Sequence, residues 1–139
     1  MRLRNVKNAR EIVSNHNLVV TKNPFDNSKP LHIEIGTGKG DFIIGKAKLH
    51  PEINFIGIEK YESVLIRALN KVEDIPENLR FMCFDAIKIT DYFNNNVDQI
   101  YLNFSDPWPK KKHSKRRLTS PNFLDLYNQI SKDNINIKM

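Results

Sequence analysis

The chain has 139 residues, of which 40% are hydrophobic and 27% are charged, and this composition suits one globular domain rather than two. No stretch approaches the roughly 18 consecutive apolar residues of a membrane span, and the N-terminus is polar, so we expect a cytoplasmic protein with no membrane partner. The single cysteine, Cys83, excludes disulfide scaffolds and zinc ribbons. Neither His32 nor His113 has a cysteine or carboxylate at metal-ligand spacing, so no metal is expected.

The net charge of +6 is concentrated in one segment. Residues 110–117 read Lys-Lys-Lys-His-Ser-Lys-Arg-Arg, and outside them the basic and acidic residues balance. Such a cluster suits a polyanion, because each phosphate that it neutralises releases condensed counterions. Nucleic acid is therefore the expected partner, although a solvated run of lysines or a nuclear localisation signal would have the same composition.

Apolar runs of strand length alternate with segments of helical period, and this alternation predicts βαβ units with a parallel sheet. Predicted helices cover residues 6–14, 41–49 and 62–72, a short helical turn at 87–93, and a helix that opens at Ser120-Pro121. Predicted strands cover residues 31–35, 55–58, 79–84 and 99–104, with a fifth strand only begun at 135–139. The last helix is expected to turn these apolar residues inward: Phe123, Leu124, Leu126, Tyr127 and Ile130.

Three of the five glycines lie in one loop, Gly36-Thr37-Gly38-Lys39-Gly40, between the first strand and its helix. Glycines there let the backbone approach a ligand closely, or simply serve a tight strand-to-helix turn. Position 41 is aspartate where a dinucleotide-binding fingerprint requires glycine, and no P-loop is present, so NAD and nucleoside triphosphates are disfavoured. Glu34 lies inside the otherwise apolar first strand, where a carboxylate needs a cation or a hydrogen-bond donor. A ligand with an ammonium or sulfonium centre would supply one.

Further acids close the following strands: Glu59 the second, Asp85 the third, and Asp106 just after the fourth. Because the carboxyl ends of parallel strands share one edge of a sheet, we expect these side chains and Glu34 to form one ligand site. Glu59 is placed to hold the ribose hydroxyls of a nucleoside. Taken singly, each acid fits a helix cap or a solvated charge better than a ligand site, and Asp85 before Ala86 suits a cap; it is the four acids together that favour a site.

The segment after the fourth strand is rigid and aromatic. Two prolines flank Trp108, the only tryptophan, and hold its plane where a purine could stack, although a Trp buried under the loop would fit the same residues. No G-x-S-x-G nucleophile elbow is present, so hydrolase chemistry has no support.

These motifs together resemble one known family. Glu-Ile-Gly-Thr-Gly-Lys-Gly at 34–40, Ile-Glu at 58–59, Asp-Ala at 85–86, and above all Asn-Phe-Ser-Asp-Pro-Trp-Pro-Lys at 103–110 with Lys-Arg-Arg-Leu at 115–118 resemble the tRNA (guanine-N7)-methyltransferases. The resemblance implies a class I methyltransferase with a Rossmann-like α/β fold and a mostly parallel, doubly wound sheet whose last strands are missing. It divides the chain into an N-terminal helix and loop, residues 1–30, and an incomplete S-adenosylmethionine-binding domain, residues 31–139.

The resemblance also implies roles for individual residues. S-adenosylmethionine would be the cofactor, with Glu34 near its methionine part, Glu59 on the ribose, and Asp85 and Ala86 at the adenine. The complete implied cofactor set is Glu34, Gly36, Gly38, Glu59, Asp85, Ala86 and Asp106. Asp106 would also be the catalytic residue, and Lys110 would contact the substrate guanosine. The implied tRNA contacts are Lys112, His113, Ser114, Lys115, Arg116 and Arg117. The family pattern continues into Thr-Asp and Thr-x-x-Glu motifs that this sequence does not contain, so the guanosine pocket is expected to be incomplete.

The chemistry of guanine N7 agrees with these residue types. N7 carries a lone pair and no proton, so no base is required to create the nucleophile. A carboxylate placed near the purine helps, because it stabilises the positive charge that develops there.

Three other functions remain open. The first is methylation of an exocyclic amine, whose Asp/Asn-Pro-Pro-aromatic motif Ser105–Trp108 partly resembles, although Trp108 replaces the second proline. The others are a non-catalytic RNA-binding fragment and an RNA chaperone, which would use the basic segment alone.

Overall fold

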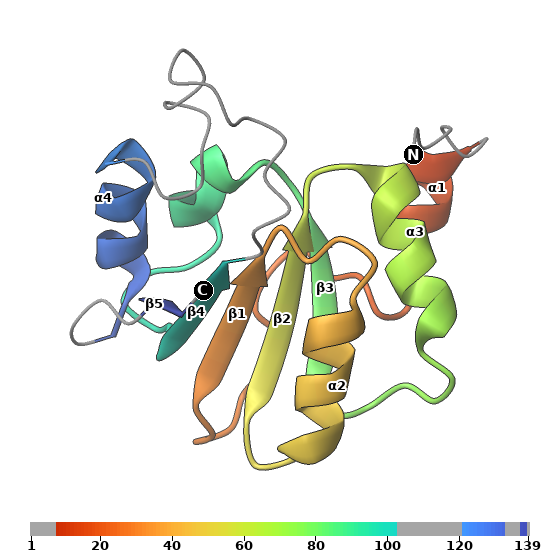
Figure 1. Cartoon of the computed structure of the whole chain (residues 1–139), viewed down its shortest axis with the longest axis horizontal. Helices are drawn as coiled ribbons and strands as arrows, with labels where there is room; N and C mark the ends of the chain where they lie inside the picture. Colours follow the sequence, from red (N-terminus) through yellow and green to blue (C-terminus); the bar gives the residue numbers. More distant parts are fainter. Residues whose placement is uncertain (1–7, 103–120, 133–136, 139) are drawn as a thin grey trace.

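The computed structural model describes residues 8–102, 121–132 and 137–138. Its centre is a parallel sheet of five strands in the order β3-β2-β1-β4-β5 (Figure 1). The strands are β1 (Leu31–Ile35), β2 (Asn54–Glu59), β3 (Leu79–Cys83), β4 (Gln99–Leu102) and β5 (Ile137–Lys138). The helices are α1 (Ala9–Ser14), α2 (Asp41–Leu49), α3 (Glu62–Lys71), the 3-10 helix η1 (Ala86–Asp91) and α4 (Pro121–Ile130).

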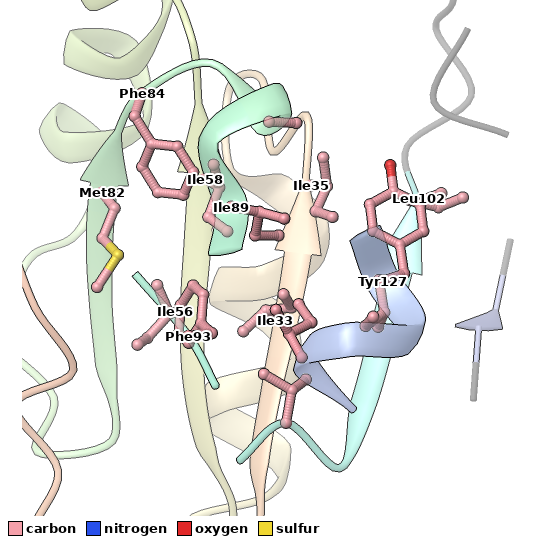
Figure 2. Packing of buried hydrophobic residues seen from close by; sticks show 14 of the residues in the cluster. Ile33, Ile35, Ile56, Ile58, Met82, Phe84, Ile89, Phe93, Leu102 and Tyr127 are labelled. Atoms are coloured by element: carbon pink, nitrogen blue, oxygen red, sulfur yellow. The ribbon is translucent and has the colours of Figure 1, made fainter. Parts of the chain in front are cut away.

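Both faces of the sheet are covered, which explains why its strands are nearly continuous apolar runs. Every residue of β2, which lies between β3 and β1, is buried. On one face, Ile33, Ile56 and Met82 pack with η1 and α4, and Figure 2 shows these side chains in one apolar layer with Ile89, Phe93 and Tyr127. On the other face, residues of α1, α2 and α3 pack over Phe55, Leu79 and Phe81.

The predicted α/β fold class is confirmed, and the predicted elements agree closely with the observed ones. The predicted continuation of β4 through residues 103–104 and the cap at Ser120 lie outside the described residues. One burial prediction was wrong: Leu124 is 37% exposed, whereas Phe123, Tyr127 and Ile130 are buried. The reason is helical geometry, because positions 123, 127 and 130 share one face and 124 is rotated away from it.

The segment before β1 packs on the same body as the sheet. Val13 of α1 and Leu18 belong to the core on the α2 and α3 side. The backbone N–H of Val20 donates to the carbonyl of Phe81 at 2.9 Å, alongside the outer strand β3. At their carboxyl ends, β1 leads into the glycine loop, β2 toward the start of α3 and β3 toward the start of η1 (Figure 1). Glu34 lies within β1, Glu59 is the last residue of β2, and Asp85 lies between β3 and η1.

Candidate functional site

The glycine loop after β1 is wound tightly over the end of β2. Gly36, Gly38 and Gly40 have φ angles of 75°, 58° and 81°, a region that side chains disfavour. The N–H groups of Gly36 and Thr37 both donate to the carbonyl of Ile58 at 2.9 Å. A Cβ at Gly40 would lie 2.8 Å from the Cβ of Ala68 on α3, so the start of α2 lies directly against that helix. The glycines thus serve strand-to-helix packing as well as exposing backbone at the edge of the sheet.

Glu59, the last residue of β2, holds two loops together. One carboxylate oxygen accepts the N–H of Gly38 at 3.0 Å, and the other accepts the N–H of Tyr61 at 3.1 Å. The residue is buried. Each carboxylate oxygen can accept more than one hydrogen bond, so Glu59 retains acceptor capacity toward a ligand hydroxyl.

Glu34 lies beneath the glycine loop with 3% of its surface exposed. Its Oε1 accepts a hydrogen bond from the hydroxyl of Thr37. Burial raises the pKa of Glu34 from 4.5 to about 7, the Thr37 hydroxyl opposes that rise, and the charge of Glu59 adds to it. The carboxyl group therefore titrates near neutral pH, where a neighbouring cation would ionise it.

Asp85, after β3, has protein partners for both oxygens. Oδ1 accepts the N–H of Ile87 at 3.2 Å and caps η1, and Oδ2 forms an ion pair of 3.3 Å with Lys60. The cap that the sequence allowed as an alternative is therefore present. Ala86 is buried as the first residue of η1. Because Lys60 directly follows Glu59, this ion pair joins the ends of β2 and β3.

The described residues thus bring Glu34, Gly36, Gly38 and Glu59 together, and Asp85 lies just after the adjoining strand β3, joined to Lys60 by an ion pair. The other predicted site residues lie outside the described part of the chain: Asp106, Lys110, Lys112, His113, Ser114, Lys115, Arg116 and Arg117.

Sequence reasoning missed three residues of this edge: Thr37, Gly57 and Lys60. A hydroxyl three positions after a buried carboxylate was the available signal for Thr37. Gly57 lies beside Glu34 in the β1–β2 register, and a Cβ there would lie 2.9 Å from Thr37 Oγ1 and from the Phe81 ring. No sequence pattern indicated a role for Lys60, because its ion-pair partner Asp85 is 25 positions away along the chain.

The described residues contain no group of three or more His, Cys, Asp or Glu side chains that could hold a metal ion. None of the helices in residues 8–102 and 121–132 is long and apolar enough to cross a membrane.

Comparison with known proteins identifies the family. A family model described as "Putative methyltransferase" matches residues 28–139. A tRNA (guanine-N(7)-)-methyltransferase of Lysinibacillus sphaericus is 48% identical over 96% of this chain and 68% of its own length. The chain belongs to the tRNA (guanine-N(7)-)-methyltransferase family. A second member, from Lachnoclostridium phytofermentans, is 53% identical over 94% of this chain and 66% of its own length, so the chain spans about two thirds of these methyltransferases.

Solved structures support the fold of this methyltransferase family member. A SAM-dependent methyltransferase from Aquifex aeolicus has a TM-score of 0.56 at 22% identity, covering 76% of this chain and 54% of that one. The antibiotic-resistance methyltransferase Kmr has a TM-score of 0.57 at 16% identity, covering 74% and 54%. At these identities the similarity establishes the Rossmann-like methyltransferase fold alone.

Proposed function

We propose that this chain carries the cofactor-binding part of an enzyme that methylates N7 of a guanine in the variable loop of tRNA. The observation that carries the proposal is the joint placement of Glu34, Glu59 and the glycine loop at one carboxyl edge, in a chain about 50% identical to enzymes named for this reaction. Residues 31–139 form the proposed cofactor domain. The proposed setting is the cytoplasm.

The described residues fit S-adenosylmethionine in charge and in hydrogen-bonding capacity. Glu34 offers a buried carboxyl group to a cationic methionine end, and Glu59 offers acceptor capacity to ribose hydroxyls. Asp85 and Ala86 are proposed at the adenine. The ion pair with Lys60 leaves the Asp85 carboxylate less available for hydrogen bonds to a ligand than the Glu59 carboxylate. When bound, S-adenosylmethionine supplies the methyl group.

The chain's own contribution to catalysis is positioning and electrostatics. Guanine N7 has a free lone pair, so no residue needs to remove a proton before transfer. Asp106 is proposed to stabilise the positive charge that develops on the purine, and Lys110 to hold the guanosine. Residues 112–117 are proposed to bind the tRNA backbone through their cationic side chains and His113 and Ser114.

Cofactor binding is the first test. Calorimetric titration of the 139-residue chain with S-adenosylmethionine is expected to show saturable binding, weakened at least about tenfold by Glu59→Ala because hydrogen bonds to a charged acceptor are lost. Glu73→Ala, at an exposed position on the surface, is the control and should bind as the unmodified chain does. Absence of binding by a folded chain would refute the cofactor assignment.

The catalytic assignment has its own test. Asp106→Asn is expected to lower the single-turnover rate of N7 methylation on bound tRNA by about 100-fold, because a preorganised charge near the reacting centre is removed. Asp91→Asn, at an exposed residue of η1, is the matched control. An undiminished rate in Asp106→Asn would show that the assignment is wrong. Salt-dependent tRNA binding without cofactor-dependent product would favour the alternative of a non-catalytic RNA-binding chain.

A further inference from the structure

Thr37 is held at three points, one of which is the buried carboxyl group of Glu34. Its N–H donates to the carbonyl of Ile58 and its own carbonyl accepts the N–H of Gly40, both at 2.9 Å. Its hydroxyl donates to Glu34 Oε1, and Thr37 is itself 2% exposed. The two backbone bonds do not depend on the side chain, so the hydroxyl can be removed while the loop remains anchored.

The neighbouring strand leaves room for this hydroxyl. Gly57 lies opposite Glu34 in the β1–β2 pairing, and a Cβ at that position would be 2.9 Å from Thr37 Oγ1 and 2.9 Å from ring carbons of Phe81. On the other side, Tyr101 of β4 is the register partner of Glu34. The Tyr101 hydroxyl lies 3.4 Å from His32 Nδ1. Because Gly57 has no side chain, the Thr37 side chain fills the space above it and contacts Glu34 there.

The contact leaves one carboxyl oxygen available. Oε2 of Glu34 accepts no hydrogen bond from any of the described residues, whereas Oε1 is fixed by Thr37. A carboxyl group held at one oxygen has its second oxygen fixed in direction as well. Within residues 8–102, 121–132 and 137–138, Glu34 caps no helix and forms no ion pair. Its carboxyl group is therefore suited to a ligand cation rather than to structural stabilisation.

We propose that Thr37 is a positioning residue, which orients the Glu34 carboxylate and keeps it ionisable for the cationic methionine end of S-adenosylmethionine. This inference rests on the proposed function. Gly57 is part of the same device, because a side chain there would displace the Thr37 hydroxyl. Among the described residues, Glu59 of β2 is the charged group that acts on Glu34, and its effect opposes ionisation.

The first arm of the test needs no cofactor. Glu34 is titrated in the full chain by carboxyl-carbon NMR in the unmodified protein, Thr37→Val and Thr37→Ser. Valine has the shape of threonine without the donor, so the Glu34 midpoint should rise by about one pH unit, as expected for a lost hydrogen bond to a charged group. Serine retains the donor and should restore the original midpoint. Thr90→Val, at an exposed threonine of η1, is the matched control.

The second arm compares two ligands across pH. For S-adenosylmethionine, Thr37→Val should weaken binding about fivefold at pH 7, more strongly at pH 6, and little above pH 8.5, because the raised midpoint leaves fewer ionised carboxylates only at lower pH. Adenosine, which lacks the methionine part, should bind equally to both proteins at every pH.

The outcomes separate the two proposals. An unchanged Glu34 midpoint in Thr37→Val would overturn the positioning role. Equal weakening of S-adenosylmethionine and adenosine at every pH would also overturn it, by showing a merely structural effect. If the unmodified chain binds neither ligand, the proposed function fails, and the Glu34 midpoint still decides whether Thr37 controls this carboxyl group.

Discussion

Glu34 shows how burial changes the chemistry of a single residue. A carboxylate removed from water loses hydration, so its pKa rises from 4.5 to about 7 despite the hydrogen bond from Thr37. A pKa raised on folding means that the folded state binds the proton more tightly than the unfolded chain. The associated stabilisation is fully present below about pH 4.5 and is lost as pH rises toward 7.

Glu34→Gln should therefore change the pH dependence of stability. Glutamine resembles the protonated carboxyl group and can still accept from Thr37, so it removes the cost of a buried charge. We expect the variant to gain about 1–3 kcal/mol in unfolding free energy at pH 8 relative to the unmodified chain, with a much smaller difference at pH 5. Urea denaturation at the two pH values measures this gain. Glu73→Gln, at an exposed glutamate, is the control, and an equal effect of Glu34→Gln at both pH values would contradict the explanation.

Gly57 carries a steric prediction at the same scale. Its added methyl group would meet Phe81 and the Thr37 hydroxyl at 2.9 Å, within a buried strand that has little freedom to move. Gly57→Ala should lower the unfolding free energy by about 1–3 kcal/mol, the usual cost of overpacking a core. Urea denaturation measures the loss, and an unchanged midpoint would show that the neighbouring side chains adjust freely.

At the scale of the helix, α2 offers the matched opposite case. Gly45 lies inside α2, and a Cβ built there meets nothing within 4 Å. Gly45→Ala should raise the unfolding free energy by about 0.5–1 kcal/mol, because alanine loses less backbone entropy in a helix. The same urea measurement applies, and destabilisation would mean that the glycine has a role that these contacts do not reveal.

The elements are held together mainly by their apolar faces. Leu65, Ala68 and Leu69 of α3 are buried with Ile43 of α2 in one core. The ion pair between Lys71 of α3 and Asp41 of α2 measures 2.6 Å, but its side chains are 38% and 79% exposed. Such a pair contributes at most about 1 kcal/mol, so burial and not charge fixes the packing of α2 against α3.

At the scale of the whole molecule, two kinds of charge are separated along the chain. Three of the proposed cofactor acids, Glu34, Glu59 and Asp85, lie at the ends of β1, β2 and β3, whereas the excess positive charge lies in residues 110–117, between β4 and α4. Cofactor and tRNA binding should therefore respond to different substitutions.

Replacing Lys115, Arg116 and Arg117 by alanine should weaken tRNA binding and leave the affinity for S-adenosylmethionine unchanged. The slope of log K against log salt should become shallower by about two to three, because binding through fewer phosphate contacts releases fewer counterions. Filter binding at several salt concentrations measures the slope. The control replaces exposed lysines elsewhere, at Lys22, Lys48 and Lys88, and an equal change there would show that only net charge matters.

The sequence by itself was sufficient for the order of the elements, the parallel α/β fold and the placement of acids at strand ends. Each of these is a local property, since a period of apolar residues sets a helix or a strand, and a residue that closes a parallel strand lies at the carboxyl edge. The family resemblance came from the same local motifs, and the comparisons confirmed it.

Only the tertiary structure decided what each carboxyl group does. Glu59 joins two loops, Asp85 caps η1 and pairs with Lys60, and Glu34 meets the Thr37 hydroxyl above Gly57. The exposure of Leu124 was decided in the same way, by the face that α4 turns to the sheet. These outcomes depend on distances between segments remote in sequence and on the water that burial removes. A one-dimensional pattern contains neither quantity.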